Sequence, residues 1–214
     1  MDGFEVEYKG HYKAIRNVVV DSVTKEAGIS SFADSKACAE CEVAGKKICK
    51  DKTVLMVNSR CRFTVVELER FFDQFDGTSL AAVKDKCDLM LYDEENCRLA
   101  FCEMTCTQEK YILPYKNSRG HNDGKRAKAY NQLKSSICKL AAVPGISLKM
   151  GLYSERSALF AVRLKNEPAG ESTSTQMMAH RFSRLARSIQ DGAKLNMGNG
   201  FTFEVVQYPR VFQW

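Results

Sequence analysis

The stretch CDLMLYDEENCRLAFCEMTCT, residues 87–107, consists of two apolar runs around one acidic turn. Residues 87–92 and 98–106 are rich in strand-forming side chains, and the tetrapeptide DEEN between them predicts a hairpin. Because both faces of these runs are mostly apolar, we expect two central strands that are covered on both sides. Each run also contains one carboxylate, Asp88 or Glu103, where an apolar residue is expected.

The spacing of these two carboxylates depends on the loop of the hairpin. If Glu94 and Glu95 form a two-residue loop, residue 88 pairs with residue 101, and Glu103 lies one diagonal step away on the same face. Strand alternation gives that face an apolar surface, made of Met90, Tyr92, Leu99, Phe101 and Thr105. Asp88 and Glu103 are therefore expected to converge at the rim of an apolar surface.

Asp88 and Glu103 would repel each other and lose hydration unless something compensates their charge. Mg²⁺ prefers hard oxygen ligands and commonly takes one or two carboxylates together with water and substrate phosphates. We therefore predict that this pair binds Mg²⁺ or Mn²⁺. The alternative is that each carboxylate is a solvated charge at a strand end or forms an ion pair with Lys84, Lys86 or Arg98.

The composition of the chain is that of a globular protein. Its 214 residues are 44% hydrophobic, which is enough for a sizeable core. The apolar runs are too short to span a membrane, and the first residues lack the features of a secretory signal. Nine cysteines, several of them inside expected strands or helices, favour reduced thiols and a cytoplasmic location. The net charge of +6 permits nucleic-acid binding without requiring it.

Upstream of the hairpin, the pattern predicts strands and then a helix. Phe4, Val6 and Tyr8 alternate with polar residues, so residues 1–60 are expected to form a strand-rich extension that packs on a core of residues 61–214. The core begins with a helix over 64–76, in which Thr64 and Glu67 would form a capping box.

Downstream of the hairpin, helical and strand patterns alternate. A long helix is expected from residue 124 to the Pro-Gly pair at 144–145, and a third helix from 178 to 191. The expected strands form a second hairpin, over 145–153 and 158–164, and a closing pair, over 201–208 and 211–214.

This order of elements resembles the core of the PD-(D/E)XK nuclease superfamily. A helix precedes a strand that opens with Asp88, the next strand carries Glu103-Met104-Thr105, and a helix with KAYNQL (128–133) and a further strand follow. In that family an Asp opens one strand and a (D/E)-x-K motif follows on the next. The resemblance covers about residues 60–165 and implies an α/β fold of restriction-endonuclease-like type, with helices flanking a mixed central sheet.

The resemblance implies a metal-dependent nuclease that hydrolyses phosphodiester bonds in DNA or RNA, with DNA favoured. Asp88 and Glu103 would be its catalytic metal ligands, and Glu69 in the preceding helix an additional ligand. Bacterial antiviral defence or mobile-element function fits such a protein. A partner, such as an ATPase in a multisubunit complex, would select the target.

The chain departs from the family pattern at the motif lysine, which Thr105 replaces. A hydroxyl cannot replace an ammonium that positions the attacking water or stabilises developing charge. Either the lysine has moved to the following helix, where Lys128 is the first candidate and Lys125 the second, with Gln132 also facing the site, or the nuclease is inactive. An inactive protein would serve as a nucleic-acid-binding or assembly subunit.

Two further groups of residues are candidate binding sites. Four thiolates could hold zinc, although the second pair lacks the usual spacing and ordinary free cysteines are the alternative; they are Cys38, Cys41, Cys49 and Cys61. Contacts to a nucleic-acid backbone are expected from the segment NSRGHNDGKRAK (117–128) and from Arg181, Arg184 and Arg187.

Overall fold

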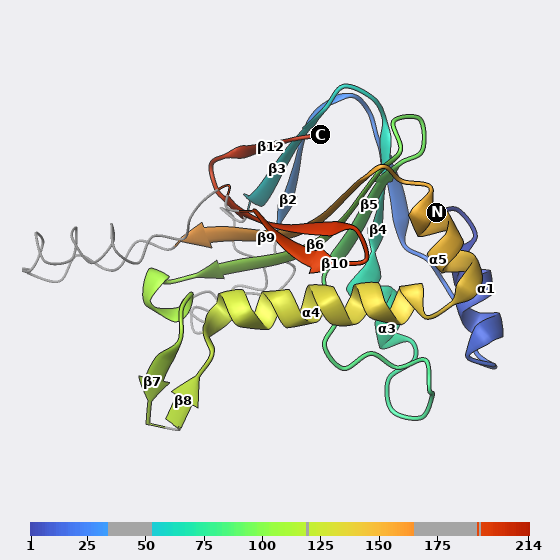
Figure 1. Cartoon of the computed structure of the whole chain (residues 1–214), viewed down its shortest axis with the longest axis horizontal. Coiled ribbons are helices and arrows are strands. Elements are labelled where there is room, and N and C mark those ends of the chain that lie inside the picture. Colours follow the sequence, from blue (N-terminus) through green and yellow to red (C-terminus); the bar gives the residue numbers. More distant parts are fainter. Residues whose placement is uncertain (34–52, 119, 165–191, 193) are drawn as a thin grey trace, which may run out of the picture.

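Figure 1 shows the computed structural model, which describes residues 1–33, 53–118, 120–164, 192 and 194–214. Its largest element is a seven-stranded sheet in the order β1-β4-β5-β6-β9-β11-β10. In that order the strands are β1 (Ser22–Lys25), β4 (Phe63–Glu67), β5 (Leu89–Asp93), β6 (Arg98–Thr107), β9 (Glu155–Leu164), β11 (Phe201–Gln207) and β10 (Lys194–Gly198). Strands β6, β9 and β11 are parallel, and the other neighbours are antiparallel. The mixed α/β class predicted from the sequence is confirmed.

The two faces of this sheet are covered by different layers. A three-stranded sheet of β2 (Gly28–Ala33), β3 (Thr53–Ser59) and β12 (Val211–Gln213) lies on one side. On the other side lie α1 (Phe4–His11), α3 (Leu68–Asp73), α4 (Gly124–Ala141) and α5 (Pro144–Gly151). Figure 1 shows α4 running along the sheet, opposite the small sheet. The first 33 residues thus contribute strands to both sheets.

Strands β5 and β6 are buried on both faces, as predicted. Their alternate residues separate cleanly between the two hydrophobic clusters. Those on the helix side are Met90, Tyr92, Leu99 and Phe101, and those on the other side are Leu89, Leu91, Ala100, Cys102 and Met104. The central hairpin is therefore the middle layer of the molecule.

The predicted two-residue loop of this hairpin is wrong. Asp93 pairs with Arg98, so four residues connect the strands. The buried Asp93 carboxylate accepts hydrogen bonds from the backbone N–H (3.1 Å) and the side-chain amide (2.6 Å) of Asn96, which closes the longer turn. The register shifts by two residues as a result, and Leu89 pairs with Cys102.

The predicted helix over 64–76 is also wrong in its first turn. Residues 63–67 form β4, in which Thr64 pairs with Thr24 of β1 and with Tyr92 of β5. The helix α3 begins at Leu68, and its N-cap residue, Glu67, makes no side-chain capping bond. The β-branched run from 64 to 66 favours the strand, and pairing on both sides overrides the capping-box pattern.

The N-terminal segment is helical where strands were predicted. Phe4 and Tyr8 lie four residues apart on α1, and their rings contact Phe71 of α3 at centroid distances of 4.9 and 5.3 Å. Val6, which alternation placed on the same face, is 69% exposed. A spacing of four residues is compatible with the strand period of two and with the helix period of 3.6. Packing of both rings against α3 stabilises the helix.

The predicted hairpin over 145–153 and 158–164 and the predicted closing pair over 201–208 and 211–214 are both wrong. Residues 144–151 form α5, with Pro144 in its first turn, and β9 pairs in parallel with β6. At the end of the chain, β11 pairs with β9 and β10, whereas β12 pairs with β3. The helix α4 ends at Ala141, shortly before the predicted Pro-Gly stop.

Several sequence predictions fall outside the described residues. They concern the third helix over 178–191, its arginines Arg181, Arg184 and Arg187, and the cysteines Cys38, Cys41 and Cys49. Of the four cysteines considered for zinc, only Cys61 is described, as a half-buried free thiol.

Candidate functional site

Asp88 directly precedes β5, and Glu103 lies on β6. The register that pairs Leu89 with Cys102, extended by one residue, places residue 88 against residue 103, one step closer than the diagonal pairing expected. The Asp88 carboxylate reaches across to β6 and accepts a hydrogen bond of 2.6 Å from the backbone N–H of Met104. Both acids are half-buried, and Oε2 of Glu103 is buried from solvent. The structure thus brings the two predicted carboxylates together.

The start of α3 fixes the backbone of Asp88. The N–H groups of Leu68 and Glu69 donate to the carbonyl oxygen of Asp88, at 2.9 and 3.2 Å. These are the first N–H groups of the helix, which have no partner within the helix itself. Glu69, the third predicted ligand, is therefore attached to Asp88 through the backbone, and its side chain is half-buried.

The helix α4 holds the residues just before Asp88. Gln132 donates from its side-chain amide to the carbonyl oxygen of Lys86, at 2.9 Å, and the N–H of Cys87 donates to Oγ of Ser136, at 3.0 Å. Gln132 thus faces the site, but as a group that positions the backbone. The sequence analysis missed Ser136, whose signal is a polar residue on the apolar stripe of α4 between Leu133 and Ile137.

The lysines predicted to assist catalysis lie closer to the N-terminal end of α4 than Gln132. Lys128 and Lys125 are exposed, one and two turns before Gln132. Thr105 is half-buried and stands two residues beyond Glu103, on the same face of β6.

The cations considered as partners of the two carboxylates bind other acids. Lys86 forms ion pairs with Asp73 and Asp76, at 2.5 and 2.7 Å. Arg98 forms an ion pair with Glu155, at 2.9 Å, across the starts of β6 and β9. Two of the three cations considered, Lys86 and Arg98, are therefore engaged with other acids.

Two buried thiols report the negative potential of the pair. Burial, and then the charges of Asp88 and Glu103, raise the pKa of the Cys102 thiol well above its usual value. Burial also raises the pKa of the Cys87 thiol; its hydrogen bond with Ser136 opposes this rise, and both carboxylates add to it. A cation placed between the carboxylates would relieve this negative potential.

The donor set at the site consists of hard oxygen atoms. The described residues contain no group of three or more His, Cys, Asp and Glu side chains placed to hold a metal ion. A pair of carboxylates is nevertheless a common protein contribution to Mg²⁺, since water and substrate phosphates supply the remaining ligands. Asp88 and Glu103 are the two residues of this site whose side chains could hold such an ion.

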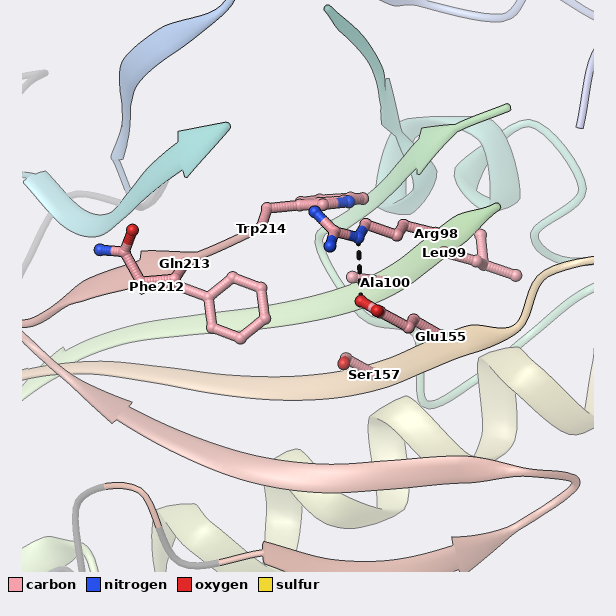
Figure 2. Close-up of a pocket in the computed structure, with 8 residues that line it drawn as sticks. All are labelled: Arg98, Leu99, Ala100, Glu155, Ser157, Phe212, Gln213 and Trp214. Carbon is pink, nitrogen blue, oxygen red and sulfur yellow. Dashed lines mark ion pairs between the residues drawn. The ribbon is translucent and has the colours of Figure 1, made fainter. Parts of the chain in front are cut away.

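A shallow pocket lies on the far side of the sheet from α4. Figure 2 shows its lining, in which the ion pair of Arg98 and Glu155 lies near Trp214 and Phe212. The Trp214 indole stacks on Phe63, with ring centroids 5.3 Å apart. Asp88 and Glu103 do not line this pocket, so it is separate from the carboxylate pair.

In the part of the chain that the structure describes, no helix has the length and hydropathy that a membrane span requires. No protein-family model, no curated protein and no solved structure matches this chain.

Proposed function

We propose that this protein is a metal-dependent nuclease that hydrolyses phosphodiester bonds in nucleic acid, with DNA as the favoured substrate. The observation that carries the proposal is the position of Asp88, at the entry to β5, next to Glu103 on the adjacent strand β6. The bond from Met104 to Asp88 orients one carboxylate, and Oε2 of the other, Glu103, is buried. Mg²⁺ or Mn²⁺ held by this pair would activate water and stabilise charge on the scissile phosphate.

The connection of the strands supports a restriction-endonuclease-like core. Strands β4, β5 and β6 form an antiparallel meander, α4 crosses the sheet, and β9 returns parallel to β6. The family resemblance rests on this order of elements, with an acid at the start of the second meander strand and another in the third. In this reading Asp88 and Glu103 occupy the two acidic motif positions.

Lys128 is our candidate for the role of the missing motif lysine. It lies four residues before Gln132, which is about 6 Å along the helix axis. Thr105 lies two residues beyond Glu103, about 7 Å along the strand. Because α4 runs back across the strand that precedes it, both displacements point the same way, and the flexible stem of Lys128 would let its ammonium reach toward Thr105. Its ammonium would stabilise charge on the phosphate.

The test is cleavage of supercoiled plasmid, linear DNA and single-stranded RNA with Mg²⁺ or Mn²⁺. We expect the Asp88→Asn and Glu103→Gln variants to lose activity by a factor on the order of 10³, because each removes a charged metal ligand. Lys128→Met should reduce the rate and leave metal binding intact. The control is Glu155→Gln, which removes an exposed carboxylate from the far face. Equal activity in the Asp88→Asn variant and the wild type would disprove the proposal.

Thr105 favours a second function, that of an inactive nuclease-like protein acting as a nucleic-acid-binding or assembly subunit. Its hydroxyl stands where the family has an ammonium, and Gln132 is engaged with the backbone of Lys86. If the wild type does not cleave and Thr105→Lys does, the fold is that of an inactive nuclease. If neither protein cleaves but both bind DNA, the binding function stands alone.

A further inference from the structure

A two-stranded arm projects from the molecule beside the start of α4. It consists of β7 (Tyr115–Asn117) and β8 (Gly120–Asn122), which pair with each other and, among the described strands, with no other. Figure 1 shows the arm extending beyond the N-terminal end of α4, away from both sheets. All three residues of β8 are exposed. An isolated hairpin of this kind is marginally stable, so its direction depends on what holds its base.

The base of the arm is fixed to α4 by the backbone. Gly124 has a φ of +82°, and a Cβ at this position would lie 2.5 Å from the carbonyl oxygen of Ile112. The chain entering the arm thus crosses the chain leaving it at a distance that only glycine permits. The N–H of Gly124 donates to Oδ1 of Asn122, at 2.9 Å, and the N–H of Arg126 donates to the Ile112 carbonyl, at 3.1 Å. These contacts hold the arm in one direction.

The arm and the first turn of α4 carry a concentration of positive charge. Lys116 on β7 and Lys125 in the first turn of α4 are exposed, and so is Lys110 in the short 3₁₀ helix η1 (Glu109–Tyr111) that leads into the arm. Asp123 lies 3.5 Å from His121, and the first turn of α4 contains no acidic residue. Basic residues at the start of a helix oppose the helix dipole, an arrangement that an anion bound there would make favourable.

We propose that the arm and the first turn of α4 bind the backbone phosphates of duplex DNA on one side of the cleaved bond, an inference that rests on the proposed function. Lys110, Lys116 and Lys125 would contact the phosphates. The eight residue steps from Gly124 to Gln132 span about 12 Å. At about 3.4 Å per base pair, the base of the arm lies roughly four base pairs along the helix from Gln132. A two-stranded ribbon also has the dimensions to enter the major groove.

The test measures binding of a labelled duplex by fluorescence anisotropy in EDTA, where a metal-dependent nuclease does not cleave. The double variant Lys110→Ala/Lys116→Ala is compared with Lys84→Ala/Lys134→Ala, which removes the same charge from exposed sites away from the arm. We expect the arm variant to bind about tenfold more weakly and to lower the salt slope of log Kd by about 2. The control variant should keep the wild-type affinity. Equal melting temperatures establish that both variants fold.

The outcomes separate this inference from the proposed function. Equal affinity loss in the two double variants, or none in either, would overturn the role of the arm, whatever the result of the cleavage assay. A loss of affinity in the arm variant alone supports the role of the arm, even if the wild type never cleaves. The Asp88→Asn variant, which lacks a proposed metal ligand, measures in the same assay how much of the DNA affinity is independent of the metal site. Selective loss on single-stranded RNA, with duplex affinity unchanged, would also contradict the proposal.

Discussion

Two carboxylate sites on the same sheet differ in what surrounds their charge. Glu204 of β11 is 5% exposed and lies on the side of the small sheet; it accepts a hydrogen bond of 2.8 Å from Arg210 and lies 3.6 Å from Lys194. Asp88 and Glu103 lie opposite each other, and Asp88 accepts from a backbone amide. The first site is an acid with cations supplied by the chain, as expected of a structural element. The second places two carboxylates against each other, and under the proposed function a bound cation would balance part of their charge.

The largest effect expected from the difference between the two sites is an increase in the free energy of unfolding on adding metal. If Asp88 and Glu103 bind Mg²⁺ or Mn²⁺, a metal concentration of about 100 times the Kd should stabilise the fold by about 2.7 kcal/mol. Thermal denaturation with and without metal measures this. The Asp88→Asn/Glu103→Gln variant should lose the metal-dependent shift, and Glu204→Gln should keep it. A shift of the same size in all three proteins would place the metal elsewhere.

The second effect is the cost of removing the acid at the structural site. Glu204→Gln keeps the shape of the side chain but removes the negative charge that Arg210 and Lys194 contact. Since Arg210 is 32% exposed and can be hydrated, we expect a loss of about 2 kcal/mol in the free energy of unfolding, less than for a fully buried pair. Urea denaturation gives the value.

Glu155→Gln is the matched control for this loss. It removes the ion pair with Arg98, in which the Glu155 side chain is 65% exposed, and should cost about 0.5 kcal/mol or less. Equal losses in the Glu155→Gln and Glu204→Gln variants would contradict the distinction drawn between a buried and an exposed acid.

How far the sequence predicted these sites depends on the type of pattern. The two-sided apolar runs of β5 and β6 and the apolar stripe of α4 identified the central layer and its covering helix, because burial acts directly on residue type. The capping-box pattern of Thr64 failed because pairing on both sides of β4 outweighs a local cap. The register was missed because it depends on one side chain, Asp93, bonding to Asn96. That bond brings Glu103 opposite Asp88.

The third effect is a dependence of stability on pH near the carboxylate pair. Burial and the nearby charges raise the pKa of the Cys87 and Cys102 thiols well above the usual value in the folded protein. In the unfolded chain they lose protons from about pH 8.5 upward, so the unfolded state then binds fewer protons and stability falls with rising pH. The expected slope is about 1.4 kcal/mol per pH unit and thiol above pH 9.

Urea denaturation between pH 8 and pH 10 measures this slope. The Cys87→Ala/Cys102→Ala variant should show a flatter dependence than the wild type, because the two protons are no longer linked to folding. Cys138→Ala removes an exposed thiol and should keep the wild-type slope. Identical slopes in the wild type and the double variant would show that the buried thiols do not sense their surroundings as described.

The smallest effect tests how the fold holds the carboxylate pair in place. Ser136→Ala removes the acceptor of the Cys87 N–H and leaves a buried donor without its partner, which should cost about 1 kcal/mol in the free energy of unfolding. Since that bond fixes the residue before Asp88, the variant should also bind metal more weakly than the wild type. Ser135→Ala, its half-buried neighbour on α4, should change neither quantity. If Ser136→Ala lost stability and kept the wild-type metal affinity, the bond between Cys87 and Ser136 would stabilise the core without orienting Asp88. The orientation of Asp88 would then depend on its bonds with α3 and Met104.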